Sequence, residues 1–188
     1  GRSIVEFPLF VRQINPNCNY FKDFLGRVFY RDAYYPSSLL VLGPQDKREQ
    51  YYWHRVKGIK SNKFVIAKTK PNCIGSDGDS VIYNNYVFKG GDASSFQKID
   101  YSYFKDKDHV YYSQGKLIPG ADPQTFEILI TDECTNSQPP YSRDARYTYY
   151  ANQLVAEADR ETFKLICDQG TVKGKDKSHT FLGYEIEK

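Results

Sequence analysis

The side chains of this chain that could do chemistry are few, and their spacing fits no common catalytic motif. The three histidines are His54, His109 and His179, and none of the four cysteines forms a Cys-x-x-Cys pair. The chain has no Gly-x-Ser-x-Gly elbow, phosphate-binding glycine-rich loop or His-Glu-x-x-His segment, so it lacks the signals of common hydrolases, nucleotide-binding proteins and zinc proteases. We therefore predict a protein that is not an enzyme, with no catalytic residues and no cofactor. The missing motifs weaken an enzymatic role without excluding it.

Two groups of polar residues suggest chemistry but have simpler explanations. Residues 76–80, Ser-Asp-Gly-Asp-Ser, begin like a calcium loop but lack the later ligands of such a loop, so we predict no metal site. His109 and His179 each lie two residues before an aromatic residue, at the same place in two copies of a repeated segment. This position favours a role in the scaffold over a role as general base.

The repeated segment is Asp-Lys-Asp-His-Val-Tyr-Tyr at residues 106–112, and similar segments occur along the whole chain. Each copy begins with Asp and ends in a strand-like triplet. The six copies begin at Asp23 (with one inserted residue), Asp46, Asp77, Asp106, Asp144 and Asp176. Successive starts from the second copy onward are 31, 29, 38 and 32 residues apart. The sequence therefore predicts a repeat of about 30 residues.

A second landmark supports the repeat, because four of the Asp starts are followed 18 to 20 residues later by Phe64, Phe96, Phe126 or Phe163. Before the landmark come short segments such as Asp-Pro-Gln-Thr at residues 122–125, which are typical of a single turn with an Asp cap. Each unit then consists of a strand, a tight turn, a second strand, a capped turn and a third strand. We predict an all-β single domain, residues 1–188, of about six three-stranded repeats.

The two ends of the chain suggest how the repeats could be joined. The last copy stops after two strands, and Phe10 lies 13 residues before Asp23, just as Phe64 lies 13 before Asp77. Residues 4–11 would then supply the missing third strand of the last unit. This arrangement predicts a closed, propeller-like ring, which leaves no sheet edge exposed. An open, curved β-meander is the alternative.

Composition supports a β-rich, exported protein. The 188 residues include 17 Tyr and 12 Phe, residue types that favour pleated sheet. No apolar run approaches the roughly 18 residues of a membrane-spanning helix, so we predict no membrane span. The chain contains no Met and starts with Gly-Arg-Ser, which is typical of either a cloning scar or a processed end, and a removed signal peptide fits this start. A lipid anchor lost in the same way is compatible with this start.

The four cysteines bear on the compartment. No histidine lies at zinc-finger spacing from them, so we predict two disulfides formed in an oxidising compartment. The cysteines follow equivalent strands, those that contain Phe10, Phe64, Phe126 and Phe163. The ends of equivalent strands in adjacent units should lie close together. We predict pairing of Cys134 with Cys167 and of Cys18 with Cys73, out of three possible connectivities. Four buried free thiols in a cytosolic protein are the alternative.

The repeats resemble the DKNYY repeat family, a group of mostly bacterial and often exported proteins of poorly defined activity. The resemblance is closest over residues 103–130, although Asp108 stands where the family name has Asn. The family carries no catalytic assignment that could be transferred. Its members are encoded, among other contexts, beside secreted antibacterial toxins that include phospholipase effectors. The resemblance therefore implies a periplasmic immunity protein whose partner is such an enzyme.

One stretch departs from the repeat background and is the candidate binding surface. Residues 50–76 contain no Asp or Glu but several cations next to aromatic residues. Aromatic side chains and Arg dominate protein interfaces, and charge of one sign speeds encounter with an acidic partner. The predicted partner-binding residues are Tyr51, Tyr52, Trp53, His54, Arg55, Lys57 and Lys60. The alternatives are a solvated strand face with a buried Trp53, or nucleic acid, which we do not predict because the net charge is only +3.

Three function classes stay open from the sequence. An inhibitor or immunity protein predicts a tight complex with one secreted enzyme, and it is the class we favour, with a periplasmic or otherwise exported location. An envelope scaffold or surface binding protein predicts no single enzyme partner. An enzyme predicts turnover that depends on a few polar residues.

Overall fold

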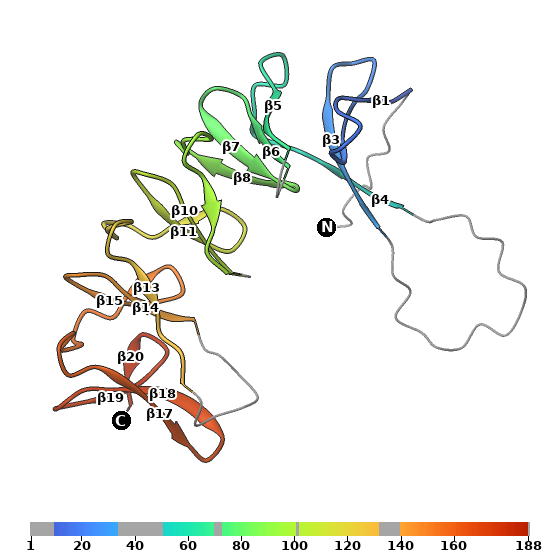
Figure 1. The fold of residues 1–188 in the computed structure, drawn as a ribbon. Helices are drawn as coiled ribbons and strands as arrows, with labels where there is room; N and C mark the ends of the chain where they lie inside the picture. Colours follow the sequence, from blue (N-terminus) through green and yellow to red (C-terminus); the bar gives the residue numbers. More distant parts are fainter. Residues whose placement is uncertain (1–9, 34–50, 70–72, 101, 132–139, 188) are drawn as a thin grey trace, which may run out of the picture. The chain divides into compact units, whose positions relative to one another are not determined.

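The computed structural model describes residues 10–33, 51–69, 73–100, 102–131 and 140–187, and the fold is given for these residues. They form strands and turns without any helix, so the predicted all-β class is confirmed (Figure 1). It follows that no described segment is a long apolar helix of the kind that crosses a membrane. The chain divides into two compact units, residues 1–93 and 94–188, which are described separately.

Within the described residues, the first unit contains two four-stranded antiparallel sheets. The strands of each sheet follow one another in chain order. The first sheet consists of β1 (Arg12–Gln13), β2 (Tyr20–Lys22), β3 (Val28–Ala33) and β4 (Tyr51–Arg55). The second consists of β5 (Val65–Lys68), β6 (Ile74–Ser76), β7 (Ser80–Tyr83) and β8 (Tyr86–Lys89).

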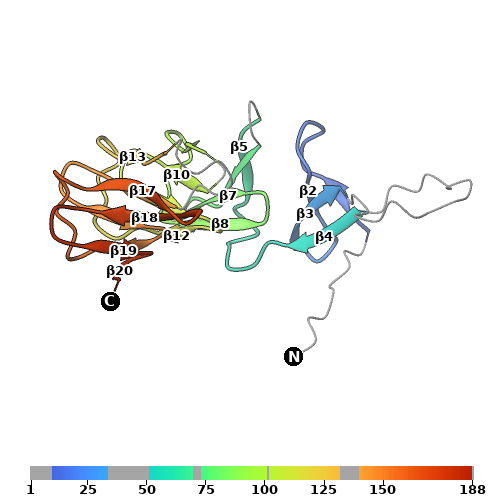
Figure 2. The same cartoon turned by 90° about the horizontal axis from the view of Figure 1, so that it is seen from below.

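The second unit contains three sheets of the same kind in its described part. The third sheet consists of β9 (Gln97–Lys98), β10 (Tyr103–Lys105), β11 (Val110–Tyr112) and β12 (Lys116–Leu117). The fourth consists of β13 (Glu127–Ile128), β14 (Tyr141–Arg143), β15 (Thr148–Tyr150) and β16 (Gln153–Leu154). The fifth consists of β17 (Lys164–Asp168), β18 (Thr171–Lys175), β19 (Thr180–Leu182) and β20 (Glu185–Ile186), which lie side by side in Figure 2.

The repeat is real, but its unit differs from the prediction. Each sheet has four strands and not three, because the triplet before each buried Asp, such as Tyr103–Lys105, is a strand of its own. The second to fifth sheets each begin just after a landmark Phe. The described residues form five sheets and not six, since the strand after Asp46 is β4, the fourth strand of the first sheet, paired with β3. Asp46 itself lies outside the described residues.

A buried aspartate organises the turn between the second and third strands of every described sheet. Asp23, Asp77, Asp106, Asp144 and Asp176 are at most 5% exposed. In the last four, Oδ1 accepts hydrogen bonds from the backbone N–H groups two and three residues ahead, at 2.6–3.0 Å. In the first sheet, the donors are two and four residues ahead of Asp23 because of the inserted residue. The repeated Asp is therefore the cap of this turn.

The second oxygen of the same carboxylate ties down the segment that enters the sheet. The backbone N–H groups of Lys60, Asp122 and Asp159 donate to Oδ2 of Asp77, Asp144 and Asp176 at 2.7–2.9 Å. In Asp144, Oδ2 also accepts the hydroxyl of Tyr149, and in Asp106 it accepts that of Tyr111. A negative charge is costly to bury unless it accepts several hydrogen bonds, and this arrangement supplies them.

The landmark Phe residues pack each sheet onto the next within a unit. Phe126 contacts Tyr103 of the third sheet and Tyr149 of the fourth, with ring centroids 5.4 and 6.3 Å apart. Phe163 lies in the same way between Tyr141 and Phe181. Its ring lies directly over Gly174, where a Cβ atom would come within 2.3 Å of it. Any larger residue at Gly174 would displace the ring.

Tyrosine hydroxyl groups add a directional link between neighbouring sheets. Tyr20 donates to the carbonyl of Ile82 at 3.2 Å, and Tyr141 donates to the carbonyl of Gly183 at 2.8 Å. The hydroxyl of Tyr103 also donates to the next sheet, at the carbonyl of Pro140 just before β14. The corresponding residue of the second sheet, directly before the division into two units, is Ile74, which has no hydroxyl.

In the fifth sheet the same position is Lys173, whose ammonium group bonds to Asp168 at 2.7 Å and Glu187 at 2.5 Å. The fifth sheet therefore presents an ion-paired cation where the other sheets present an apolar ring or chain.

Tight turns between the third and fourth strands lie where the sequence predicts them. Asn84, Ser113, Gln114 and Ala151 adopt positive φ angles, as hairpin turns of this kind require. The predicted closing strand at residues 4–11 lies outside the described residues except for Phe10 and Val11. In the last sheet, Phe181 pairs with β18 on one side and β20 on the other.

Replacing Asp144 should be strongly destabilising. Asp144→Ala removes a fully buried carboxylate that accepts hydrogen bonds from three backbone N–H groups and the Tyr149 hydroxyl. We expect the free energy of unfolding to fall by about 3 kcal/mol or more, because buried donors left unpaired cost 1–3 kcal/mol each. Urea denaturation measures this. Asp108→Ala, at an exposed position of the equivalent turn, should change it by less than about 0.5 kcal/mol, and an equal effect of both variants would contradict the assignment.

Stability should fall in acid because of the same carboxylates. Burial by itself raises the pKa of Asp144 and Asp176, but the hydrogen bonds they accept outweigh it, so both pKa values lie below the ordinary range. The stability they contribute is therefore complete above the unfolded-state pKa of about 4 and is lost as the pH falls through the lower folded-state values. We expect the urea midpoint to drop between pH 5 and pH 3. A constant midpoint over this range would refute the prediction.

Candidate functional site

The predicted binding residues centre on β4, which pairs with β3 in the first sheet. Direct partners across this pair are Phe29 with Arg55 and Arg31 with Trp53, and Phe29 is also paired with Phe21 of β2. Directly opposite residues of antiparallel strands share one face of the sheet. These five residues therefore form one surface, which we call the Trp53 face.

Aromatic rings and guanidinium groups alternate on the Trp53 face. The partly buried Trp53 ring meets the Phe21 ring edge-on, with centroids 5.0 Å apart. The guanidinium of Arg31 lies 4.7 Å from the centre of the Phe21 ring, within range of a cation–π interaction. Phe21 and Phe29 are buried, and Arg55 is exposed. Trp53 is thus packed against Phe21 but keeps accessible surface. This lies between the two sequence-based expectations, a partner-binding residue and a buried Trp.

The other predicted aromatic residues point to the opposite face. Because side chains alternate along a strand, Tyr52 and His54 lie on the face that also carries Tyr20 and Tyr30. Tyr52 is 54% exposed, and its ring lies 6.5 Å from that of His54. The side chain of Tyr51 lies outside the described part. The structure therefore brings Trp53 and Arg55 together but separates them from Tyr52 and His54.

The two predicted lysines follow β4 in the segment that leads to the second sheet. Lys57 is exposed. Lys60 has a structural role, since its backbone N–H donates to Asp77 and its ammonium forms an ion pair with Asp79. The hydrogen bond and charge of Asp79 raise the pKa of Lys60, while Lys60 lowers the pKa of Asp79. Only Lys57 of this pair is a simple surface cation.

Arg31 is the residue of this surface that sequence reasoning missed. It lies on β3, outside the acid-free stretch that defined the candidate site, and reaches the Trp53 face only through its register opposite Trp53. The signal that could have found it is the period-two alternation of β3, which places Phe29 and Arg31 on one face.

A sequence profile of the DKNYY family matches residues 9–138, more than two thirds of the chain. The chain belongs to the DKNYY family. No curated protein and no solved structure matches it. The DKNYY match includes the first three sheets, and the buried Asp and packed Phe recur beyond it at Asp144, Phe163 and Asp176. The repeat architecture of this DKNYY protein therefore extends past the matched segment.

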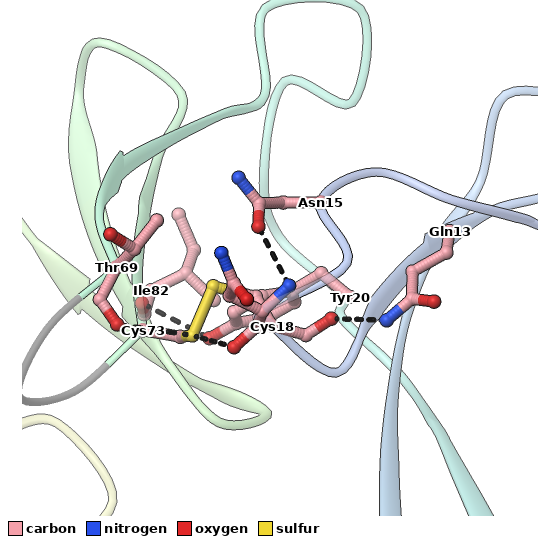
Figure 3. The surroundings of a disulfide bond; sticks show 8 residues. Gln13, Asn15, Cys18, Tyr20, Thr69, Cys73 and Ile82 are labelled. Atoms are coloured by element: carbon pink, nitrogen blue, oxygen red, sulfur yellow. Dashed lines mark hydrogen bonds between the residues drawn. A yellow bond between two sulfur atoms is a disulfide. The ribbon is translucent and has the colours of Figure 1, made fainter.

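A disulfide joins the two sheets of the first unit of this DKNYY protein (Figure 3). Cys18, just before β2, is bonded to Cys73, just before β6, with Cα atoms 5.6 Å apart. The predicted pairing of Cys18 with Cys73 is confirmed. Tyr20 and Ile82 lie beside the bridge and make the hydrogen bond that links the same two sheets.

Cys167 is also disulfide-bonded, while Cys134, its predicted partner, lies outside the described residues. The disulfides agree with an exported protein. In the described segments, no group of three or more His, Cys, Asp and Glu side chains could hold a metal ion. His109 and His179 occupy equivalent places after the buried Asp, and their backbone N–H groups donate to it. The scaffold role of their side chains stays a prediction.

Removing the first disulfide should destabilise the first unit. The bridge closes a loop of 55 residues, for which the chain-entropy model gives about 4 kcal/mol. We expect Cys18→Ala/Cys73→Ala to lower the free energy of unfolding by an amount of that order in urea denaturation. Peptide mapping without reductant should show no free thiol and should recover Cys134 linked to Cys167. Four free thiols in the native protein would contradict both expectations.

Proposed function

We propose that this protein is an exported inhibitor that neutralises a secreted antibacterial enzyme, specifically a phospholipase effector, as a periplasmic immunity protein. The observation that carries the proposal is the Trp53 face, where a partly accessible indole lies beside two arginines. Trp and Arg are the residue types most enriched among binding hot spots, and partial burial holds an anchor in one orientation before binding. DKNYY membership and the disulfides support the family context and the exported location.

The charge of the segment around Trp53 favours an acidic partner. Arg55, Lys57, Lys63 and Lys68 follow in a stretch without acidic residues, while Lys60 forms an ion pair with Asp79. Such a field accelerates encounter with a surface of opposite sign and orients it. The inhibitor would meet the enzyme with its cationic segment and hold it through the Trp53 face.

The second candidate is an envelope scaffold without a single enzyme partner. A stack of small sheets with repeated surface turns suits a spacer as well as an inhibitor. The two candidates differ in stoichiometry: an inhibitor forms a one-to-one complex with an enzyme and stops its turnover, whereas a scaffold does neither. Incubation with a secreted antibacterial phospholipase, followed by size-exclusion chromatography and a lipid-hydrolysis assay, separates them.

Trp53→Ala should weaken the complex more than it destabilises the fold. As a hot-spot anchor, Trp53 should contribute about 2 kcal/mol or more to binding. The indole is also packed on Phe21, so we expect a measurable loss in the free energy of unfolding. Trp53→Phe should restore stability more fully than affinity. Calorimetric titration and urea denaturation of the same variants give both quantities. A Trp53→Ala variant that binds with native affinity would remove the Trp53 face from the site.

The cationic segment is tested by reversing the charge of Lys57, which is an exposed residue. Lys60 is not used, because the reversal would break its ion pair with Asp79. Lys57→Glu should mainly slow association and reduce its dependence on salt. Lys116→Glu, at an exposed position of the second unit, is the matched control with the same change in net charge. Equal effects of the two reversals would show that only total charge matters.

A further inference from the structure

The turn between β2 and β3 differs in chemistry from the equivalent turn of the other described sheets. In each turn, two residues follow the buried Asp at the tip. In the second to fifth sheets these pairs are small, polar or charged: Gly78-Asp79, Lys107-Asp108, Ala145-Arg146 and Lys177-Ser178. In the first sheet they are Phe24 and Leu25. The buried Asp23 accepts the backbone N–H groups of Leu25 and Arg27, so the apolar pair is presented on a hydrogen-bonded turn.

These apolar side chains are exposed and gather into one patch. Phe24 is 63% exposed and Leu25 is 59% exposed. Phe10, 90% exposed, meets the Phe24 ring edge-on with centroids 6.4 Å apart, and Val11 beside it is 38% exposed. We call these four residues the Phe24 tip. Single exposed apolar residues are ordinary, but a contiguous group with two aromatic rings marks a site of interaction.

Two cations flank the Phe24 tip. Arg12 follows Val11, Lys22 precedes Asp23, and the two are direct partners across β1 and β2. Like charges placed directly opposite each other destabilise a strand pair. In the fourth sheet, the equivalent residues Arg143 and Glu127 form an ion pair.

The fifth sheet repeats the like-charge pair with Lys164 and Lys175, but there the tip is the polar pair Lys177 and Ser178. Among the sheets described, the first alone combines two opposed cations with an apolar tip.

The charge of the whole chain also places the excess of cations in the first unit. Residues 1–93 contain 14 Lys and Arg against eight Asp and Glu, a formal charge of +6, whereas residues 94–188 contain 12 against 15, a charge of −3. Such asymmetry between halves is typical of proteins that bind an anionic surface. The first unit therefore combines a protruding apolar tip, adjacent cations and a positive field.

We propose that the first unit docks on the surface of a membrane that contains anionic lipids, with the Phe24 tip inserted among the acyl chains and with Arg12 and Lys22 against the headgroup phosphates. An exposed turn is convex, and a fluid lipid layer adapts to a convex apolar group. The phosphates supply the countercharge that Arg12 and Lys22 do not give each other. Apolar insertion and attraction to anionic lipids add together in peripheral membrane binding. This inference does not depend on the proposed inhibitory function.

The test is co-sedimentation of the full, disulfide-bonded protein with vesicles of phosphatidylcholine containing 30% phosphatidylglycerol. We expect binding that weakens with added salt and is much lower on pure phosphatidylcholine. Phe24→Ser/Leu25→Ser should reduce the partition coefficient about tenfold or more, because it removes most of the inserted apolar surface. Arg12→Gln/Lys22→Gln should reduce the partition coefficient on anionic vesicles and flatten its salt dependence.

The matched control is Lys107→Ser/Asp108→Ser at the equivalent tip of the third sheet, which should bind vesicles like the native protein. Thermal unfolding of each variant shows that the fold is intact. The proposal is overturned if the native protein does not bind anionic vesicles, or if Phe24→Ser/Leu25→Ser binds them equally well. Undiminished vesicle binding by that variant, together with lost affinity for a protein partner, would assign the Phe24 tip to the protein partner instead.

Discussion

A carboxylate buried in the turn between the second and third strands is the constraint on which each described sheet depends. Desolvation alone would make such a group expensive, and it is tolerable only where donors converge on both oxygens. One oxygen fixes the turn within the sheet, and the other fixes the chain that arrives from the preceding sheet, as in Asp144 and Asp176. A single short side chain therefore determines both the shape of a hairpin and its distance from the neighbouring element. Glu would be too long to serve both groups of donors from the same turn.

Aromatic side chains hold consecutive sheets together. Each sheet has strands of two to six residues and could not be stable alone, since isolated small sheets bury too little apolar surface. Phe126 and Phe163 fill the space between consecutive sheets, and the tyrosine hydroxyls of Tyr103 and Tyr141 fix the angle at which the rings enter. Burial raises the pKa of Tyr141 to about 12, so its hydroxyl stays a proton donor throughout the physiological range.

The sequence determined the period of this repeat but not its phase, and the reason is physical. A periodic pattern is unchanged when its starting point is moved, so the Asp and Phe landmarks cannot show where one sheet ends and the next begins. Hydrogen bonding between strands decides this, and it places Tyr103–Lys105 in the same sheet as Val110–Tyr112. The Cys18–Cys73 pair was predictable because it depends only on equivalence between units. The division of Trp53 from His54 follows from strand alternation, but the faces they occupy are set by register with β3.

Lys173 in the fifth sheet has a consequence for assembly of the chain with copies of itself. Stacked-sheet proteins risk uncontrolled end-to-end polymerisation, because an end that resembles an internal junction accepts another molecule. Here the position that carries a bridging Tyr in the first, third and fourth sheets holds a cation neutralised by Asp168 and Glu187. A second molecule stacking on this face would have to desolvate Lys173, Asp168 and Glu187, and it would find no Tyr ring to pack against. The ion-paired Lys173 therefore makes this face of the fifth sheet a poorer surface for such stacking than a face that carries a Tyr ring.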